Sequence, residues 1–117
     1  MQSTEQKIER AALAGLAAAS MDERERSTDI SLAELAALVE TAGGQPVVTL
    51  LQNKPTPDPR TFLGEGKVAE LRELIVANDC DLAVFDNELS PSQMRVLEEE
   101  LGVRVLDPVS YTHLTLP

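Results

Sequence analysis

Short apolar runs alternate with segments whose apolar residues recur at helical spacing, and this alternation limits the chain to a small group of folds. The helical segments lie near residues 31–42, 67–77 and 90–101, and the apolar runs lie at 11–19, 47–51, 82–85 and 103–106. Short strands that alternate with amphipathic helices favour a parallel sheet, because right-handed crossovers then place the helices on its faces. The sequence therefore predicts an α/β fold: a small, open, mainly parallel four-stranded sheet with helices on its faces, in the order βαβαβαβ.

Local signals mark the ends of the predicted helices. Ser31-Leu32-Ala33-Glu34 and Ser90-Pro91-Ser92-Gln93 each have the spacing of a capping box, in which a serine caps the helix and the fourth side chain bonds back to it. Gly43-Gly44 and Gly102 supply the left-handed residue that ends many helices. The alanine-rich run at 11–19 also suits a helix by propensity, but the pattern that follows it favours a strand.

The loops after the strands hold the candidate site residues. In an open parallel sheet, ligands usually lie outside the carboxyl ends of the strands. The second apolar run is followed by residues 53–62, which contain three prolines and are predicted to form an irregular loop, and then by Gly64-Glu65-Gly66-Lys67. Asp86-Asn87-Glu88 follows the third run, and Asp107 follows the fourth.

The Gly64-Glu65-Gly66-Lys67 segment resembles a phosphate-binding loop but departs from both common forms. A Walker A loop is G-x-x-x-x-G-K-[ST], and here Val68 follows the lysine while the two glycines are too close together. A dinucleotide fingerprint needs its glycines directly after a strand. Gly64, Gly66 and Lys67 could still bind an anion at a helix N-terminus, or the glycines could only permit the entry into the helix.

The other polar positions carry weaker signals. Asp86 invites comparison with a response-regulator receiver domain, but that chemistry needs further acids after the first strand, where the sequence has alanines. Asp86 and Asn87 are better explained as residues that shape the turn into the third helix. No acids or cysteines have the spacing of metal ligands, and the only histidine is His113. Cys80 lies among acids and is interpreted as structural.

Charge and hydropathy exclude some partners. The chain has 20 acidic and 10 basic side chains, for a net charge of -10, so it should not coat nucleic acid non-specifically. A single cysteine fits a reducing compartment. No apolar run is long enough to span a bilayer, and the N-terminus lacks the apolar region of a signal peptide. These features predict a cytoplasmic domain with no membrane or DNA partner.

Three segments together resemble a known family. They are Phe62–Leu71 (FLGEGKVAEL), Phe85–Gln93 (FDNELSPSQ) and Gly102–Asp107 (GVRVLD). In this order they are similar to the N-terminal domain of the HflX family of ribosome-associated GTPases, whose pattern includes [FY]-[VIL]-G-x-G-K, F-D-x-x-L-S-P-x-Q and G-v-x-V-x-D-R-T. The resemblance runs from about Ala11 to Asp107.

The resemblance implies a translational GTPase that binds the large ribosomal subunit and acts in ribosome splitting or rescue under stress. In the family this domain precedes a helical hairpin and a G domain, and the G domain carries the motifs for GTP and Mg²⁺. Those motifs are absent from this sequence. The resemblance therefore implies a docking and regulatory domain with no catalytic residue of its own, which contacts the hairpin and the G domain of the same protein.

Site residues follow from the resemblance only as candidates. Some family members are reported to bind ATP through the N-terminal region, which keeps Gly64, Gly66 and Lys67 as phosphate contacts. Lys54, Arg60 and Lys67 could gather on one loop face and contact the ribosome. Two further hypotheses remain open: a small adenine-nucleotide-binding domain that uses this loop, and a plain protein-interaction domain.

The last ten residues depart from the family pattern. After Asp107 the family continues with Arg-Thr and an apolar run, whereas this chain continues with PVSYTHLTLP. That segment shows no helical period. We therefore expect residues 1–107 to form the family domain and residues 108–117, with Tyr111 and His113, to be a non-family tail, artefactual or disordered.

Overall fold

The alternating pattern of the sequence appears in the computed structural model, which describes the backbone of residues 8–115 and the side chains through Tyr111. The four strands are β1 (Arg10–Ala18), β2 (Gln45–Lys54), β3 (Leu82–Phe85) and β4 (Arg104–Leu106). The helices are η1 (Glu23–Glu25), α1 (Asp29–Thr41), α2 (Glu65–Ala77), α3 (Pro91–Leu101) and α4 (Pro108–Thr115). The predicted α/β fold with its βαβαβαβ order is confirmed.

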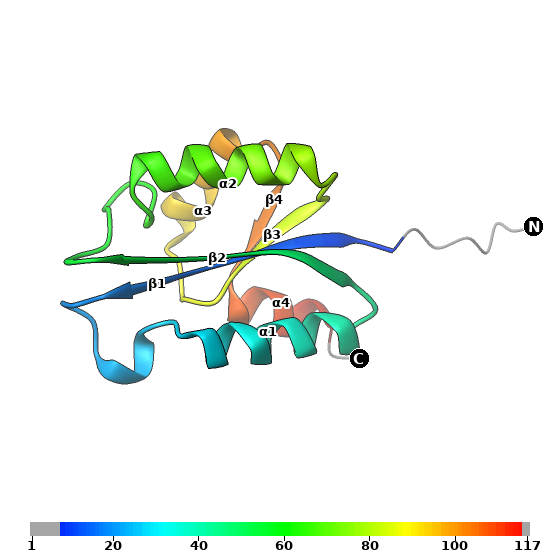
Figure 1. The fold of residues 1–117 in the computed structure, drawn as a ribbon, viewed down its shortest axis with the longest axis horizontal. Coiled ribbons are helices and arrows are strands. Elements are labelled where there is room, and N and C mark those ends of the chain that lie inside the picture. The colour runs from blue at the N-terminus through cyan, green and yellow to red at the C-terminus, as the bar shows by residue number, and fades with distance from the viewer. Residues whose placement is uncertain (1–7, 116–117) are drawn as a thin grey trace, which may run out of the picture.

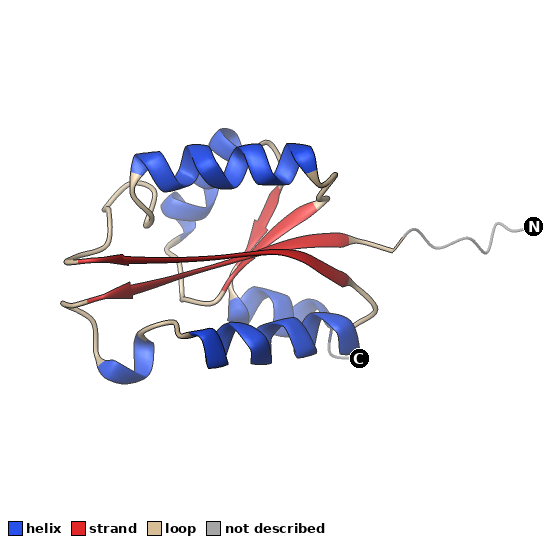
Figure 2. Ribbon diagram, in the orientation of Figure 1, coloured by secondary structure: helices blue, strands red, loops and turns tan. Residues whose placement is uncertain are grey.

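All four strands are parallel and lie in the order β2-β1-β3-β4. The chain therefore passes from β1 outward to β2 and then crosses back over β1 to reach β3 on its other side. Helices α2 and α3 cover one face of the sheet, and α1 and α4 cover the other (Figures 1 and 2). The result is a three-layer sandwich whose strand order reverses direction between β1 and β3.

The sheet separates two apolar cores. The larger core lies under α2 and α3, and its fully buried members include Leu16, Leu63, Leu71, Phe85 and Leu97. The smaller core lies under α1 and α4 and includes Leu13, Leu32, Val39 and Val84. Strand β1 contributes to both cores, because successive side chains point to opposite faces of a strand. The alanine-rich run is a strand, as predicted, and the structure places it inside the sheet between β2 and β3.

The two edges of the sheet differ. On β4, the backbone N–H of Val105 donates to a carboxylate oxygen of Glu98 on α3 at 3.1 Å. Strand β2 forms the other edge and carries Pro46 near its start and Lys54 at its end. Both edges thus contain groups that discourage a further strand from pairing.

Several predicted boundaries were wrong by a few residues. Helix α1 begins at Asp29, with Thr28 as its N-cap, so Ser31 closes the capping box instead of opening it. Strand β2 continues through Lys54, because β1 is long enough to pair with it to that point. Helix α2 begins at Glu65 and not at Lys67. The capping box from Ser90 to Gln93 was predicted correctly.

The segment after Asp107 differs most from expectation. Residues 108–115 form α4, although the sequence shows no helical period there. Asp107 precedes Pro108 and accepts the N–H of Ser110 on its carboxylate at 2.8 Å, which is the geometry of an N-cap followed by proline. Tyr111 is buried in the smaller core. Residues 116–117 and the side chain of His113 lie outside the described part, and the division at residue 107, with an artefactual or disordered segment after it, stays a prediction.

Candidate functional site

The crevice between the carboxyl ends of β1 and β3 is the first place to look for a ligand, because strand order reverses there. Strand β3 ends at Phe85, which pairs with Ala14, whereas β1 continues to Ala18. Four residues of β1 therefore extend beyond β3 and have β2 on one side only. Asp86 and Asn87 enter the space on the other side.

Asn87 fills this crevice with its side chain. Its Oδ1 accepts the N–H of Leu16 at 2.9 Å, and its Nδ2 donates to the Leu16 carbonyl at 3.1 Å. The side-chain amide of Asn87 thus makes the two hydrogen bonds to β1 that the backbone of a further β3 residue would make. Asn87 is only 4% exposed, and it also accepts the hydroxyl of Ser27 at 3.0 Å and donates to the carbonyl of Glu25 at 3.0 Å.

The connection between β1 and α1 closes the crevice from outside. Ser27 is buried, and its N–H donates to the carbonyl of Leu16 at 3.0 Å. Arg26 donates to the carbonyls of Ala18, Ala19 and Met21, at 3.0, 3.0 and 3.1 Å. A Cβ on Gly15 would lie 2.5 Å from the Ser27 hydroxyl oxygen, so only glycine allows this close approach. The crevice is therefore filled by packed, hydrogen-bonded side chains and is not a ligand site.

Asp86 joins a different pair of elements. Its N–H donates to the carbonyl of Ala14 at 2.8 Å, and its carboxylate accepts the hydroxyl of Ser31 at 2.6 Å. The sequence favours a role for Asp86 and Asn87 in the turn into α3. The hydrogen-bond partners of both side chains lie instead on β1, on α1 and in the connection between them, so these residues tie the end of β3 to the first βα unit.

The Gly64-Glu65-Gly66-Lys67 segment forms the start of α2. Gly64 is the N-cap, and its N–H donates to the side-chain oxygen of Gln52 on β2 at 2.9 Å. No side chain caps the first turn, and the exposed carboxylate of Glu65 lies within that turn. The ammonium of Lys67 pairs with Glu70 at 3.1 Å. Two of the three candidate phosphate contacts, Gly64 and Lys67, therefore already have partners within the domain.

The residues before this segment act as a core anchor. Phe62 takes a left-handed backbone conformation (φ 69°), and its ring packs edge-to-face on Phe85 with 6.4 Å between centroids. Its N–H and carbonyl both pair with Asp58, so residues 58–62 form a closed loop. Leu63 is fully buried under α2. Phe62 and Leu63, the apolar pair that begins the Phe62–Leu71 pattern, therefore anchor this loop in the core.

A glutamine connects the second signature segment to the loop that precedes the first. Gln93 closes the capping box of α3, and its side-chain nitrogen also donates to the carbonyls of Asp58 and Pro59, at 3.5 and 3.4 Å. The backbone N–H groups of Thr61 and Arg60 donate to the carboxylate of Asp58 and hold its pKa below its ordinary value. Gln93 thus ties the start of α3 to the closed loop that leads into α2.

Asp107 fixes the third segment. It is 4% exposed, and its carboxylate accepts the N–H groups of Leu89 and Ser110, at 3.2 and 2.8 Å. Burial by itself would raise the pKa of Asp107, but the hydrogen bonds from Ser110 and Leu89 outweigh burial and the net pKa is lowered. Asp107 is therefore a structural carboxylate that joins β4 to the start of α3 and to α4.

This lowered pKa predicts a pH dependence of stability. A carboxylate whose folded pKa lies below its unfolded value of about 4 stabilises the fold above that pH, and the contribution is lost as pH falls through the folded pKa. The stability gap between the wild type and Asp107→Asn should be widest near neutral pH and should narrow below about pH 4. Urea unfolding at several pH values measures it, with the exposed Asp22→Asn as control. A gap that stays constant with pH would contradict this role.

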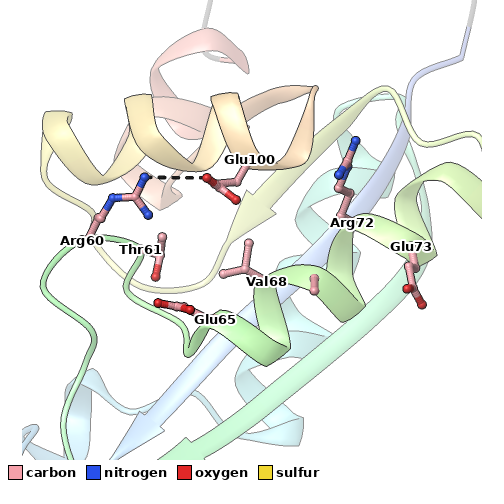
Figure 3. Close-up of a pocket in the computed structure, with 8 residues that line it drawn as sticks. Arg60, Thr61, Glu65, Val68, Arg72, Glu73 and Glu100 are labelled. Atoms are coloured by element: carbon pink, nitrogen blue, oxygen red, sulfur yellow. Dashed lines mark ion pairs between the residues drawn. The ribbon is translucent and has the colours of Figure 1, made fainter.

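The candidate ribosome contacts do not form one free basic surface. Arg60 pairs with Glu100 of α3 at 3.7 Å across a cleft of about 400 Å³ between α2 and α3, floored by Val68 (Figure 3). Lys67 pairs with Glu70. Lys54 ends β2 and makes no ion pair within the described residues. The structure thus brings the three to the same end of the sheet, where Arg60 and Lys67 form ion pairs and Lys54 interacts electrostatically with Asp58.

Other kinds of site find no support among the described side chains, those of residues 8–111. No group of three or more histidine, cysteine or acidic side chains there could hold a metal ion. Burial raises the pKa of the Cys80 thiol, which disfavours the reactive thiolate. None of the helices in this part of the chain is long and apolar enough to cross a membrane.

Comparison with known proteins finds relatives over most of the chain. The family described as "GTP-binding GTPase N-terminal" matches residues 29–111. A GTPase HflX from Alkalihalophilus pseudofirmus is 44% identical over 77 residues, which are 66% of this chain and 18% of that protein. The GTPase HflX of Escherichia coli is 37% identical over 76 residues, 65% of this chain and 18% of that protein. That of Caldanaerobacter subterraneus is 32% identical over 99 residues, 85% of this chain and 22% of that protein.

A solved structure is similar in fold. The crystal structure of an SsGBP variant superposes with a TM-score of 0.66 over 92% of this chain and 32% of that chain, at 17% sequence identity. The chain spans about a fifth of the length of the curated relatives it matches.

Proposed function

The chain belongs to the HflX GTPase family as its N-terminal domain, and from this premise we propose that it is a docking and regulatory domain. The parent GTPase, in this proposal, works in the cytoplasm, binds the large ribosomal subunit and splits or rescues ribosomes under stress. GTP and Mg²⁺ act in its G domain, because the present sequence contains no G-x-x-x-x-G-K-[ST] loop. The domain described above would help to seat the parent on the subunit and contact its G domain and helical hairpin.

One observation carries the docking role: the signature residues are engaged in holding the domain together. Asn87 closes the crevice beside β1, Gln93 bonds to the 58–59 loop, and Asp107 joins β4 to α3. When the residues of a family pattern serve to hold the fold rigid, they favour a scaffold that presents a binding surface. A catalytic site would instead need polar groups that remain available to a substrate.

Sedimentation with ribosomal subunits tests this proposal. The 117-residue chain is expected to co-sediment with isolated large subunits at low salt and to stay in the supernatant with small subunits. If it stays in the supernatant with large subunits as well, the proposed docking role fails for this domain.

A titration with ATP separates the docking role from the alternative of an adenine-nucleotide site at Gly64, Gly66 and Lys67. Nucleotide binding is the weaker hypothesis, because the Gly64 N–H bonds to Gln52 and the Lys67 ammonium pairs with Glu70. We expect no saturable binding at millimolar ATP. Saturable binding that is lost in Lys67→Ala would instead favour the nucleotide site.

A further inference from the structure

Helix α1 differs from α2 and α3 in the side that it turns away from the sheet. Its inner side is buried in the smaller core and consists of Leu32, Leu35 and Val39. Its outer side carries three exposed aliphatic residues, Ile30, Ala33 and Ala37, and Ile30 is 73% exposed. Because residues at i, i+3 and i+7 of a helix lie on one face, these three form a continuous line. We name them the α1 stripe.

The outer sides of the helices on the opposite face of the sheet are mostly charged (Figure 2). Their exposed residues include Glu65, Glu70, Arg72 and Glu73 on α2 and Arg95, Glu98, Glu99 and Glu100 on α3. On α1 the apolar surface is wider than the stripe, since Ala36, Leu38 and Leu51 of the adjoining strand β2 are half-buried. A helix that is apolar on its outer side as well as its inner side is normally covered on both. The outer side of α1 therefore has the character of a contact surface.

The charges beside the α1 stripe are all negative. By the helical repeat, Glu34 lies on one flank of the stripe, and Asp29 and Glu40 lie on the other. All three are exposed, and none of them forms an ion pair within residues 8–111. The sequence has no lysine or arginine in residues 27–53, which include α1 and nearly all of β2. The α1 stripe is thus an apolar contact line with an unpaired acidic border on both sides.

We infer that the α1 stripe docks a helix of a partner protein, with small or aliphatic residues along its contact line and lysines or arginines on both flanks. Alanines at a helix contact allow the two axes to approach closely. Charges that flank an apolar line select the partner helix, so an acidic border favours a basic helix and rejects an acidic one. A second copy of the chain fits poorly, because it would bring the acids of two α1 helices together and each copy has a net charge of -10. The inference goes beyond the proposed ribosome docking and does not depend on it.

A pair of synthetic peptides tests this inference. Both form helices of about three heptads with alanine and leucine along the contact line, and their flanks carry lysine in one peptide and glutamate in the other. The lysine peptide is expected to bind the 117-residue chain with a Kd below about 1 mM, measured by fluorescence anisotropy of the labelled peptide. The glutamate peptide should bind at least about tenfold more weakly. The double variant Glu34→Lys/Glu40→Lys should reverse this preference.

Matched controls distinguish docking on α1 from a general attraction to an acidic protein. Ala37→Gln keeps the charge but fills the stripe, and it should weaken binding of the lysine peptide about fivefold or more. Ala69→Gln, at an exposed position of α2, should change the affinity less than about twofold. Glu73→Lys/Glu99→Lys changes the net charge as much as the α1 pair does, at exposed acids of α2 and α3 that form no ion pair within the described part of the chain. It should leave the preference for the lysine peptide in place.

Several results would overturn the inference. It is wrong if Ala37→Gln binds as the wild type does, if the two peptides bind equally well, or if Glu73→Lys/Glu99→Lys reverses the preference. Self-association of the wild-type chain that Ala37→Gln abolishes, seen by analytical ultracentrifugation, would make a second copy the occupant. Failure of the full-length parent to bind the lysine peptide would mean that α1 is covered within the parent. Circular dichroism confirms that each variant remains folded, and Glu34→Gln/Glu40→Gln replaces the reversal if it does not.

Discussion

Asn87→Ala is expected to lower the free energy of unfolding by about 3 to 5 kcal/mol, measured by urea denaturation. The wild-type amide makes four hydrogen bonds while 4% exposed, two of them to the N–H and carbonyl of Leu16. Alanine removes the acceptor of the buried Leu16 N–H and of the Ser27 hydroxyl, while the Leu16 carbonyl still accepts the N–H of Ser27. Each buried group left unsatisfied costs about 1 to 3 kcal/mol.

Two further variants sharpen this prediction. Asn53→Ala removes the same amide from an exposed position on β2 and should change stability by no more than about 0.5 kcal/mol. Asn87→Asp keeps an acceptor for Leu16 and Ser27 but turns an oxygen toward the carbonyls of Leu16 and Glu25. Its loss should be nearly as large as that of Asn87→Ala at neutral pH and smaller in acid, where the protonated group can donate again. A loss below about 1 kcal/mol for Asn87→Ala would show that the crevice admits water freely.

Gly15→Ala is the second change with a large expected effect, a destabilisation of about 3 kcal/mol. The new Cβ would meet the hydroxyl oxygen and the Cβ of Ser27 at 2.5 and 2.6 Å. The Ser27 hydroxyl could rotate away, but its Cβ is fixed to the backbone and Ser27 is 1% exposed, so β1 and the connection after it must move apart. Thermal or urea unfolding measures the loss.

A double-mutant cycle identifies the cause. Ser27→Gly removes the atoms that clash, so the cost of Gly15→Ala should fall by about 1 to 3 kcal/mol in that background. Gly66→Ala is the matched glycine control, because nothing lies within 4 Å of the position of its Cβ. It should be neutral or stabilising by up to about 1 kcal/mol. Equal costs for Gly15→Ala with and without Ser27 would rule out this contact as the reason.

The elements of the fold were predictable because their signals are local. Short apolar runs identified all four strands, and apolar residues at helical spacing identified the three helices between them. The capping box at Ser90 identified the start of α3. The alanine-rich strand could be assigned only from what followed it, since its composition also suits a helix. Helix α4 was missed for a different reason: its signal lies in the cap formed by Asp107 and Pro108, and apolar spacing gave no indication of it.

The candidate site was less predictable because its contacts join residues far apart in the chain. Asn87 bonds to residues 71 and 60 positions away, Leu16 and Ser27. Nothing in a polar dipeptide after a strand indicates whether the side chains will turn into the next helix or back across the sheet. Sheet order decides this, and sheet order depends on tertiary packing. A glycine within the apolar run of β1 was the one available hint, since glycine inside a strand often marks a close approach of another segment.

The bond from Val105 to the Glu98 carboxylate has a consequence for how the domain behaves at high concentration. A parallel sheet with open edges can grow by adding strands from other molecules, which leads to fibrous aggregates. At one edge of this sheet, an incoming strand would have to displace a charged acceptor from the backbone N–H of β4. At the other edge it would meet a proline that offers no N–H and a lysine at the strand end. The domain should therefore have little tendency to polymerise through its strands, even at high concentration.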